Sequence, residues 1–337
     1  MQQTAPLTPQ LFFDTITAFQ RSAAIKSAIE LDVFTRIGEG NRTAEAIAEA
    51  CGAQARGIRI LCDSLTVMGF LNKQDDQYDL TEMSAAFLNR NSPAYCGDAV
   101  DFIMSPMQRR GFDDLTNAVR QGGSTVTEEG SLAPDSPMWV KFARGMMGMM
   151  MPAAQMIAGN LGFDPDRKLK VLDIAAGHGI FGITVARKYP NAEIYAVDWA
   201  NVLQVATENA EKFGVAARHH LIEGSAFDVE YGDGYDVVLL TNFLHHFDKT
   251  TCETLLRKIH GSLAEGGKVM TLEFVPNDDR VSPPNEAMFS LVMLAATPAG
   301  DAYTFAELKE MFENTGFSSN EHIPLTPLPQ HLIVSMK

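Results

Sequence analysis

Residues 171–179, with the sequence VLDIAAGHG, constrain the fold more than any other part of the chain. The first four residues read as a short buried strand and the rest as a tight turn, and residues 179–188 read as a helix. Small residues let a ligand lie against the backbone, and the first turn of a helix offers free N–H groups. A second apolar run, residues 194–197, ends at Asp198, whose carboxylate can accept both hydrogens of a ribose diol. The pattern predicts a strand–turn–helix unit that binds an adenosine-containing cofactor.

The identity of that cofactor depends on the residues around the glycines. Residues 177–182 match G-x-G-x-x-G, so a nicotinamide dinucleotide and an oxidoreductase remain an alternative. Asp173 lies inside the strand, where a carboxylate can organise the turn and meet a cationic amino group. This residue, and the position of the unit in the second half of the chain with further elements after it, favour S-adenosylmethionine.

The elements that follow form a characteristic series. A strand and turn at residues 221–228 precede a strand at residues 235–240 and a histidine-containing loop at residues 241–248. Thr250 and Glu253 have capping-box spacing, which predicts a helix that ends at Gly266 and Gly267. The remaining expected elements are a strand at residues 268–274, a helix capped by Thr304 and Glu307, and a terminal hairpin from residues 317–323 and 332–336.

With these motifs the chain resembles the class I S-adenosylmethionine-dependent methyltransferases. Within them it is similar to small-molecule O-methyltransferases such as the caffeic acid and acetylserotonin enzymes and the bacterial antibiotic-tailoring enzymes. The resemblance covers nearly the whole length. It implies an α/β fold, a Rossmann-like methyltransferase sheet with an antiparallel C-terminal hairpin, preceded by a helical, winged-helix dimerisation domain. The motifs that carry it are residues 173–179, Asp198, residues 224–228, residues 244–248, Gly266 and Gly267 with Glu273, and residues 300–316.

The N-terminal part of the chain has its own pattern. A helix is expected from Thr8 and Pro9 towards Leu31, a capped helix at residues 43–52, a helix at residues 53–68 and a two-stranded wing at residues 72–80. Winged helices often bind DNA, so a DNA-binding regulator is a rival class. Arg56 and Arg59 alone favour it, whereas the resemblance implies homodimerisation. We therefore expect a dimerisation domain at 1–98, connecting helices that line the substrate pocket at 99–160, and a cofactor-binding domain at 161–337.

Composition narrows the remaining classes. The 337 residues include 27 basic and 42 acidic side chains, a net charge of −15 that disfavours nucleic acid and anionic membranes as partners. The four cysteines lack paired spacing and are expected to be free thiols. No basic and apolar leader, long apolar segment or metal-ligand spacing stands out, so we expect a cytoplasmic protein without a metal site.

Candidate site residues fall into three groups. The resemblance and the turn chemistry place ten residues at the cofactor: Asp173, Ala175, Gly177, Gly179, Asp198, Trp199, Ser225, Ala226, Phe227 and Asn242. An unusual density of methionine and aromatic side chains predicts a pocket for a hydrophobic substrate, aromatic or polyketide-like, because methionine is polarizable and adaptable. The residues expected there are Phe102, Phe142, Met146, Met150, His246, Met288 and Met293.

Methyl transfer to a hydroxyl also needs a base. A phenol has a pKa of about 10, so at neutral pH it is a poor nucleophile until a base takes its proton. His245 matches the family's catalytic histidine, and Glu273 matches an acidic residue that orients it. The chain departs from the family pattern near the base. His246 stands where many relatives carry Asp, Phe247 replaces Trp, and Ala302 stands where a second glutamate occurs. In the cofactor turn, Ala175 stands where a glycine is common. A structural His245, C-methylation, and non-methylating use of the cofactor in decarboxylation, hydroxylation or cyclisation therefore remain open alternatives.

Overall fold

The computed structural model describes residues 7–126 and 136–337. The chain divides into two compact units, with the boundary between Val100 and Asp101. The second unit contains most of the segment that the sequence analysis set apart as connecting helices, together with the cofactor-binding domain. Among the helices in the described ranges, none is long and apolar enough to cross a membrane.

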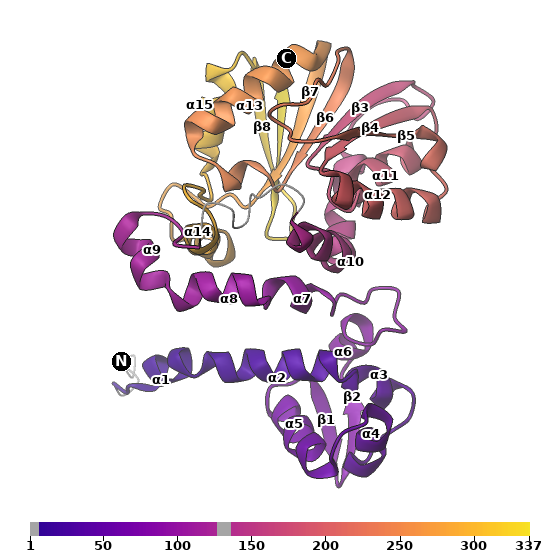
Figure 1. Ribbon diagram of the computed structural model, residues 1–337, viewed down its shortest axis with the longest axis vertical. Helices are drawn as coiled ribbons and strands as arrows, with labels where there is room; N and C mark the ends of the chain where they lie inside the picture. The colour runs from indigo at the N-terminus through magenta and orange to yellow at the C-terminus, as the bar shows by residue number, and fades with distance from the viewer. Residues whose placement is uncertain (1–6, 127–135) are drawn as a thin grey trace, which may run out of the picture. The chain divides into compact units, whose positions relative to one another are not determined.

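The first unit is a helical domain with a small hairpin (Figure 1). Its elements are α1 (Gln10–Ile16), α2 (Ala18–Glu30), α3 (Val33–Gly38), α4 (Ala44–Cys51), α5 (Ala55–Val67), β1 (Leu71–Gln74), β2 (Gln77–Leu80) and α6 (Glu82–Phe87). Thr43 caps α4 by accepting from the Ala46 amide, and Gly52 ends it in a left-handed conformation. The helices followed by an antiparallel hairpin confirm the winged-helix arrangement. The expected first helix is divided into α1 and α2 at Thr17.

The second unit is built around one sheet, with helix α7 (Ala99–Ile103) at its boundary. Its further helices are α8 (Pro106–Asp113), α9 (Leu115–Gln121), α10 (Pro137–Gly159), α11 (Ile180–Lys188), α12 (Ala200–Lys212), α13 (Lys249–Ser262), α14 (Pro284–Ala296) and α15 (Phe305–Asn314), with 3₁₀ turns η1 (Ala216–Arg218) and η2 (Leu244–His246). Its strands are β3 (Leu169–Ile174), β4 (Ala192–Asp198), β5 (His219–Glu223), β6 (Tyr235–Thr241), β7 (Leu263–Glu273), β8 (Ser319–Pro324) and β9 (His331–Met336).

The sheet has the order β5-β4-β3-β6-β7-β9-β8. The five strands β5, β4, β3, β6 and β7 run parallel, and β9 and β8 are antiparallel to their neighbours. This is the Rossmann-like sheet with an antiparallel C-terminal hairpin expected from the sequence. From β3 the chain adds β4 and β5 on one side and then returns to add β6 on the other side of β3. The strand order therefore reverses at the boundary between β3 and β6.

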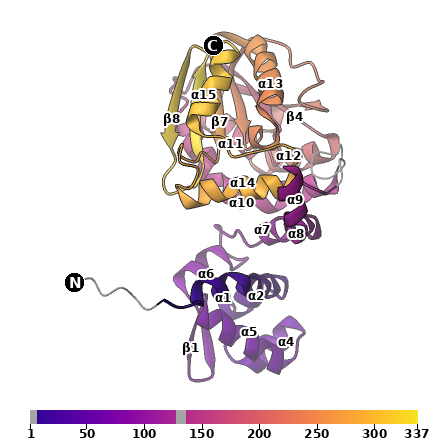
Figure 2. The ribbon, with the colours of Figure 1, turned by 90° about the vertical axis from the view of Figure 1, so that its left-hand side faces the viewer.

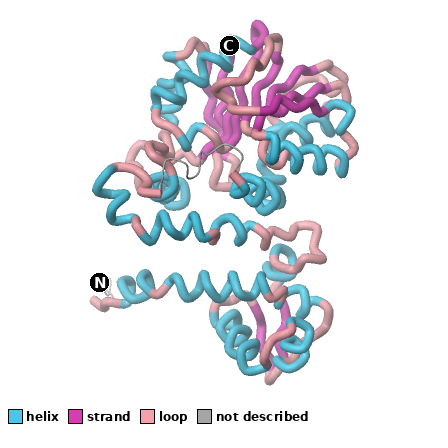
Figure 3. The backbone as a smooth tube through the Cα atoms, in the orientation of Figure 1, coloured by secondary structure: helices cyan, strands magenta, loops and turns pink. Residues whose placement is uncertain are grey.

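Helices cover both faces of this sheet (Figures 1 and 3). Helices α10, α11 and α12 pack together on one side, and α13 packs against α15 on the other (Figure 2). The central strands are apolar on both faces, and Val171, Leu172, Val238 and Leu239 are completely buried. Such burial is expected where helices cover a parallel sheet on both sides.

Two local expectations about α13 were wrong. Its N-cap is Asp248, which accepts from the Thr251 amide, because a carboxylate two residues before Thr250 takes the capping position first. The helix ends at Ser262, so Gly266 and Gly267 lie inside β7. The second capping box, formed by Thr304 and Glu307 at the start of α15, is confirmed.

Candidate active site

The predicted polar residues meet at one edge of the sheet. Asp173, Asp198 and Glu273 lie at or near the carboxyl ends of β3, β4 and β7, and His245 follows β6. Parallel neighbours place their carboxyl ends at the same edge, and ligands of open α/β sheets bind there, at the point where the strand order reverses. The fold therefore brings the candidate cofactor and catalytic residues together although the sequence spreads them over 100 residues.

Asp173 is the buried carboxylate of the cofactor edge. Its Oδ2 accepts from the Gly182 amide at 3.0 Å, which ties the strand to the first turn of α11. Its Oδ1 is buried and lacks a hydrogen-bond partner among the described residues. Burial raises the pKa of this carboxyl to about 8. An acceptor of this kind matches the cationic amino group expected from the sequence.

Asp198 closes the turn from the neighbouring strand. Oδ2 accepts from the Gly177 amide at 2.8 Å and Oδ1 from the Trp199 amide at 2.7 Å. Burial raises the pKa of Asp198 to about 6 against the opposing effect of these amides. Each carboxylate oxygen can accept a second hydrogen bond, so both retain capacity for the hydroxyls of a ribose.

The turn itself is close-packed. Gly179 has φ +71° and a Cβ there would lie 3.0 Å from the Cβ of Ala206, so a side chain would be strained and would push against α12. Ala175 has φ +53°, a conformation that L residues other than glycine adopt at a cost. The sequence analysis placed Ala175 at the cofactor; the structure adds that alanine is strained in this turn.

The other predicted cofactor residues surround this turn from three elements. Trp199 precedes α12 and packs with Ala143, Val202 and Val205. The Ser225 hydroxyl accepts from the Phe227 amide, Ala226 is buried, and the Phe227 ring lies edge-on to Phe247 at 5.0 Å. Asn242 follows β6 with φ +53°, and its Oδ1 is buried without a partner in the described ranges.

His245 and Glu273 form a buried pair. The Nδ1 of His245 lies 2.5 Å from Oε2 of Glu273. Oε1 of Glu273 accepts from the backbone amides of Phe243 at 3.0 Å and Leu244 at 2.8 Å. Three groups thus surround this carboxylate, and its contact with Nδ1 assigns the ring proton to that nitrogen, because a carboxylate accepts and the ring must donate. Nε2 is then left as the basic atom.

Aromatic rings run from this pair to the connecting helices. His246 lies 4.4 Å from His245 and 5.6 Å from Trp139, measured between ring centroids. Trp139 lies 5.7 Å from Phe142, and Phe142 lies 4.9 Å from Phe102. Burial lowers the pKa of His246 far below its ordinary value, and its Nδ1 has no hydrogen-bond partner in the described part of the chain. The predicted substrate residues Phe102, Phe142 and His246 thus belong to one aromatic series.

The four predicted methionines do not share one environment. Met146 and Met150 are buried on α10, and Met293 is buried on α14. The Met150 sulfur lies 3.7 Å from the amide nitrogens of both Asn242 and Gln330. Met288, by contrast, is 60% exposed and is not part of this buried group.

Several residues that border the histidine loop were not among the site residues predicted from the sequence, although Gly300 and Tyr303 lie in the motif at residues 300–316. A Cβ at Gly300 would lie 2.2 Å from the His245 carbonyl oxygen, and Tyr303 donates to the Phe247 carbonyl. Glu286 and Gln330 are also buried near the same sheet edge. The available signal was charge, since Glu286 is the one charged residue in the sequence of α14.

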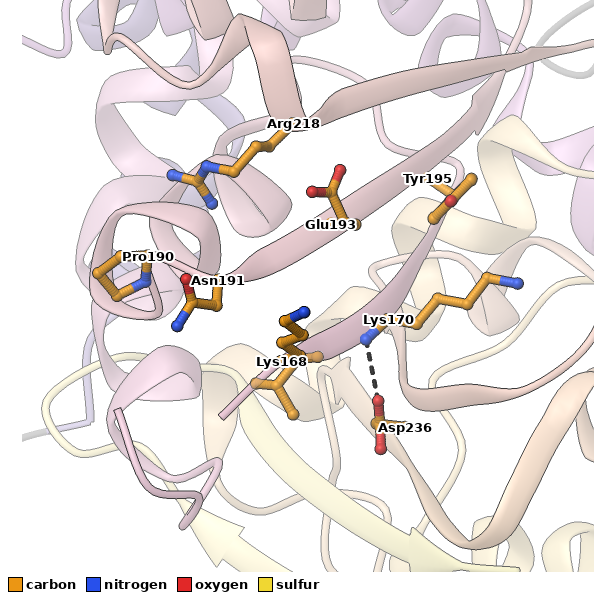
Figure 4. Close-up of a pocket in the computed structure, with 9 residues that line it drawn as sticks. Lys168, Lys170, Pro190, Asn191, Glu193, Tyr195, Arg218 and Asp236 are labelled. Carbon is orange, nitrogen blue, oxygen red and sulfur yellow. Dashed lines mark hydrogen bonds between the residues drawn. The ribbon is translucent and has the colours of Figure 1, made fainter. Parts of the chain in front are cut away.

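The remaining histidines and the pocket of Figure 4 lie outside this constellation. His219 is buried and His220 exposed, as expected for neighbours on a strand. His178 is buried, and its Nδ1 accepts from the Ile180 amide. A pocket of about 570 Å³ lies at the opposite ends of β3 and β4. Arg218, one of its lining residues (Figure 4), donates to three backbone carbonyls. No set of three possible metal ligands occurs in the ranges that the structure describes.

The residues at the sheet edge fit S-adenosylmethionine. Asp173 Oδ1 and Asn242 Oδ1 are buried acceptors without partners among the described residues, which suits an ammonium group. Asp198 supplies acceptors for a ribose, and the space beside Gly177 is open because a Cβ there would touch nothing closer than 3.9 Å.

Fold and site together define a class I methyltransferase. A model of the O-methyltransferase domain matches residues 114–318, and a model of the O-methyltransferase dimerisation domain matches residues 13–90. The chain therefore belongs to the O-methyltransferase family, and it is a methyltransferase that depends on S-adenosylmethionine.

Individual relatives agree with this assignment. The chain is 27% identical to 3-hydroxy-5-methyl-1-naphthoate 3-O-methyltransferase of Streptomyces sahachiroi over 92% of this chain and 90% of the relative. It is 26% identical to the tetracenomycin polyketide synthesis 8-O-methyltransferase of Streptomyces glaucescens over 89% of each chain. A crystal structure from Nostoc punctiforme PCC 73102, assigned to the O-methyltransferases, superposes with a TM-score of 0.94 at 54% identity, covering 99% of this chain and 100% of that one.

A more distant structure shows the same fold. Human N-acetylserotonin methyltransferase in complex with S-adenosylmethionine superposes with a TM-score of 0.86 at 21% identity, covering 100% of this chain and 99% of that one.

Proposed function

We propose that this enzyme methylates a hydroxyl group of a planar aromatic or polyketide-like metabolite, with His245 as general base and Glu273 as its positioning residue. The observation that carries the proposal is the 2.5 Å contact between His245 Nδ1 and Glu273 Oε2. A histidine held in this way presents Nε2 to a substrate proton, and its imidazolium form is stabilised by the carboxylate behind it.

The chemistry divides between the cofactor and the chain. S-adenosylmethionine, when bound, supplies a methyl group on a positively charged sulfur that departs as a neutral thioether. His245 takes the hydroxyl proton at Nε2 while the substrate oxygen forms its bond to the methyl carbon. Glu273 keeps the imidazolium charge compensated, and burial of both side chains excludes water from the pair. Asp173 and Asp198 position the cofactor through its amino group and ribose.

An aromatic substrate is supported by the rings near the base. Phe102, Phe142, Trp139 and His246 follow one another from α7 and α10 to His245, and Phe289 meets the His245 ring edge-on at 4.9 Å. Aromatic rings favour stacked or edge-on contacts with a flat guest. The named relatives act on a naphthoate and in tetracenomycin polyketide synthesis, which is the same broad class of compound.

The first unit supports a homodimer. Its terminal helices α1 and α2 expose a group of large apolar side chains, namely Leu11, Phe12, Phe13, Ile16 and Phe19. Exposed apolar clusters of this size are typical of protein–protein interfaces. We therefore propose that these helices pair with a second copy of the chain.

The test is a product assay with the full-length enzyme. It combines S-adenosylmethionine with 2-naphthol and with 2-methoxynaphthalene, whose oxygen is already blocked. We expect S-adenosylhomocysteine and a product heavier by one CH₂ from 2-naphthol only, with the new methyl on oxygen by NMR. A methyl on ring carbon would contradict the proposal, as would consumption of NADH, added to the same mixture, without methyl transfer.

The base assignment is tested with a matched pair of variants. His245→Ala should reduce kcat by roughly 10²–10⁴-fold, the usual contribution of general base catalysis, with cofactor affinity nearly unchanged. His220→Ala is the control, since His220 is exposed on β5 and contacts Glu193 away from the site. Equal turnover by both variants would show that His245 is not the general base.

A further inference from the structure

The inner face of α14 carries a carboxylate. Glu286, Phe289 and Met293 are spaced three and four residues apart, so they lie on one side of the helix. Glu286 and Met293 are buried, with 6% and 5% of their surfaces exposed. Phe289 meets the His245 ring at 4.9 Å and stacks on Phe274 at 3.9 Å. The carboxylate of Glu286 therefore lies about one helical turn from the contact with the proposed base.

Glu286 has few polar neighbours. Within the described ranges its one polar contact is Nε2 of His331 at 3.7 Å, which is longer than a hydrogen bond. It occupies the third position of α14, where a glutamate often reaches back to the N-cap amide. Pro283 is the N-cap here and has no amide hydrogen, so this partner is missing. A buried carboxylate usually has several donors, and Glu286 retains acceptor capacity.

The neighbour His331 is itself fixed. Its Nδ1 lies 2.6 Å from Nε2 of His322, and His322 stacks on Phe305 at 4.7 Å. Burial lowers the pKa of His322, and it lowers that of His331 against the opposing effect of Glu286. In the neutral pair, the N–H of one ring donates to the facing nitrogen of the other. In the sheet His331 pairs with Glu273, the residue that orients the base. Glu286 and His331 thus border the same sheet edge as the catalytic pair.

We propose that Glu286 is a specificity-determining residue that accepts a hydrogen bond from a second donor, a hydroxyl or amino group, on the aromatic substrate. Its negative charge also disfavours a substrate with a carboxylate at that place, because two like charges in a poorly solvated site repel. The inference rests on the proposed O-methyl transfer and names the class of aromatic compound that it acts on: one with a donor group in addition to the hydroxyl that becomes methylated.

The test compares four naphthols that share one hydroxyl group and differ only in the substituent at the equivalent position of the other ring. They are 2,7-dihydroxynaphthalene, 7-amino-2-naphthol, 7-methoxy-2-naphthol and 7-hydroxy-2-naphthoate. Each is assayed at saturating S-adenosylmethionine with the wild-type enzyme, Glu286→Gln, Glu286→Leu and the control Glu310→Gln. Glu310 undergoes the same chemical change as Glu286→Gln, on the exposed side of α15.

The wild-type enzyme should favour the dihydroxy and amino compounds over the methoxy compound by about 10- to 100-fold in kcat/KM, the discrimination expected from a hydrogen bond to a charged group. A preference for the dihydroxy compound alone, or for the amino compound alone, distinguishes the two possible donors. Glu286→Leu should reduce this ratio to near one. Glu286→Gln should raise kcat/KM for the naphthoate by roughly 10-fold, because the repelling charge is gone.

The outcomes separate this inference from the proposed function. A gain of activity in Glu286→Gln cannot come from damage to the fold, so it supports the assignment even if Glu286→Leu folds poorly. Equal ratios in the wild-type enzyme and both Glu286 variants would overturn it while O-methyl transfer stands. Absence of methylated product from every naphthol with the wild-type enzyme would overturn both.

Discussion

The proposed cofactor side and the proposed substrate side of the site are held together in different ways. On the cofactor side the carboxylates of Asp173 and Asp198 accept from backbone amides of one short turn and its neighbours. On the substrate side, side chains contact other side chains from distant elements, as in Glu286 with His331 and Met150 with Gln330. An amide donor is present whatever side chain its residue carries, so the contacts of the cofactor side persist when neighbouring side chains change. On the substrate side a single substitution removes a contact, so the specificity of that side can change one residue at a time.

The His245–Glu273 pair lies between the two sides and combines both modes. Glu273 accepts from two backbone amides through Oε1 and from the His245 ring through Oε2. Its position is therefore fixed like those of Asp173 and Asp198, while the ring that it contacts belongs to the proposed base. The comparison predicts that changes here affect turnover and leave cofactor affinity nearly unaltered.

The largest effect is expected for Glu273→Gln. The glutamine oxygen can still accept from the Phe243 and Leu244 amides, which leaves its NH₂ group facing His245 Nδ1. A donor there forces the ring proton to Nε2 and removes the basic atom from the substrate. We expect kcat to fall by roughly 10²–10⁴-fold at nearly constant cofactor Kd, measured by steady-state kinetics and calorimetry.

The alternative outcome for Glu273→Gln is informative. A matched loss in cofactor affinity would mean that Glu273 supports the cofactor side, and the division between the two sides would fail. Glu265→Gln, at an exposed residue of the same strand, provides the control for the chemical change.

The second-largest effect is the release of a proton from Asp173 when the cofactor binds. Burial raises the pKa of Asp173 to about 8, so most of this carboxyl is protonated at neutral pH in the cofactor-free enzyme. A cation beside Oδ1 favours the ionised form, and binding must then release a proton. Affinity should rise nearly 10-fold per pH unit below about pH 8, or about 50-fold from pH 6 to pH 8.

Calorimetry in buffers with different ionisation enthalpies measures this proton directly. In Asp173→Asn the release should vanish and the pH dependence of Kd should flatten. The same carboxyl should give the stability of the cofactor-free enzyme a pH dependence of the opposite sign. Its folded pKa lies above the unfolded value of about 3.9, so its contribution to stability is complete below pH 4 and is lost as the pH rises through about 8. Cofactor binding without proton release would contradict the contact at Oδ1.

Gly182 and Gly111 allow the tolerance of the cofactor side and of the substrate side to an added methyl group to be compared directly. A Cβ at Gly182 would lie 2.6 Å from Ile194 Cγ2 and 2.9 Å from Asp173 Oδ2, on the cofactor side. A Cβ at Gly111 would lie 2.3 Å from the Ala295 carbonyl oxygen, so it would displace α14 on the substrate side. Each alanine variant should cost about 1–3 kcal/mol of stability through overpacking.

The two variants should differ in which ligand they affect. Gly182→Ala should weaken cofactor binding by about 10-fold, and Gly111→Ala should reduce kcat/KM for the substrate by a similar factor. Calorimetry and steady-state kinetics on both proteins separate the effects. If each variant weakened both ligands equally, the two sides would have to be treated as one cooperative unit.

The same difference explains what the sequence could predict. The turn at residues 171–179 and Asp198 are short contiguous patterns with a local physical meaning, and the structure brings them together. Glu286 and His331 lie 45 positions apart, and only the pairing of β7 with β9 places His331 beside the site. The cap of α13 was misassigned because Asp248 and Thr250 are both good caps, and sequence spacing alone does not choose between them. Met288 follows the apolar pattern of α14 but is exposed, because the inner face is defined by neighbours that the sequence does not reveal.

The smallest effect concerns Ala175, where the sequence could not reveal the backbone conformation. Its φ of +53° costs an L residue roughly 1–2 kcal/mol, whereas glycine pays about 0.5–1 kcal/mol for its greater freedom in the unfolded chain. Ala175→Gly should therefore stabilise the enzyme by at most about 1.5 kcal/mol, measured by chemical denaturation. Ala176→Gly, in the neighbouring position without positive φ, should destabilise instead. Equal signs for the two variants would mean that the turn relaxes around Ala175, and the cofactor side would be less constrained than its backbone contacts imply.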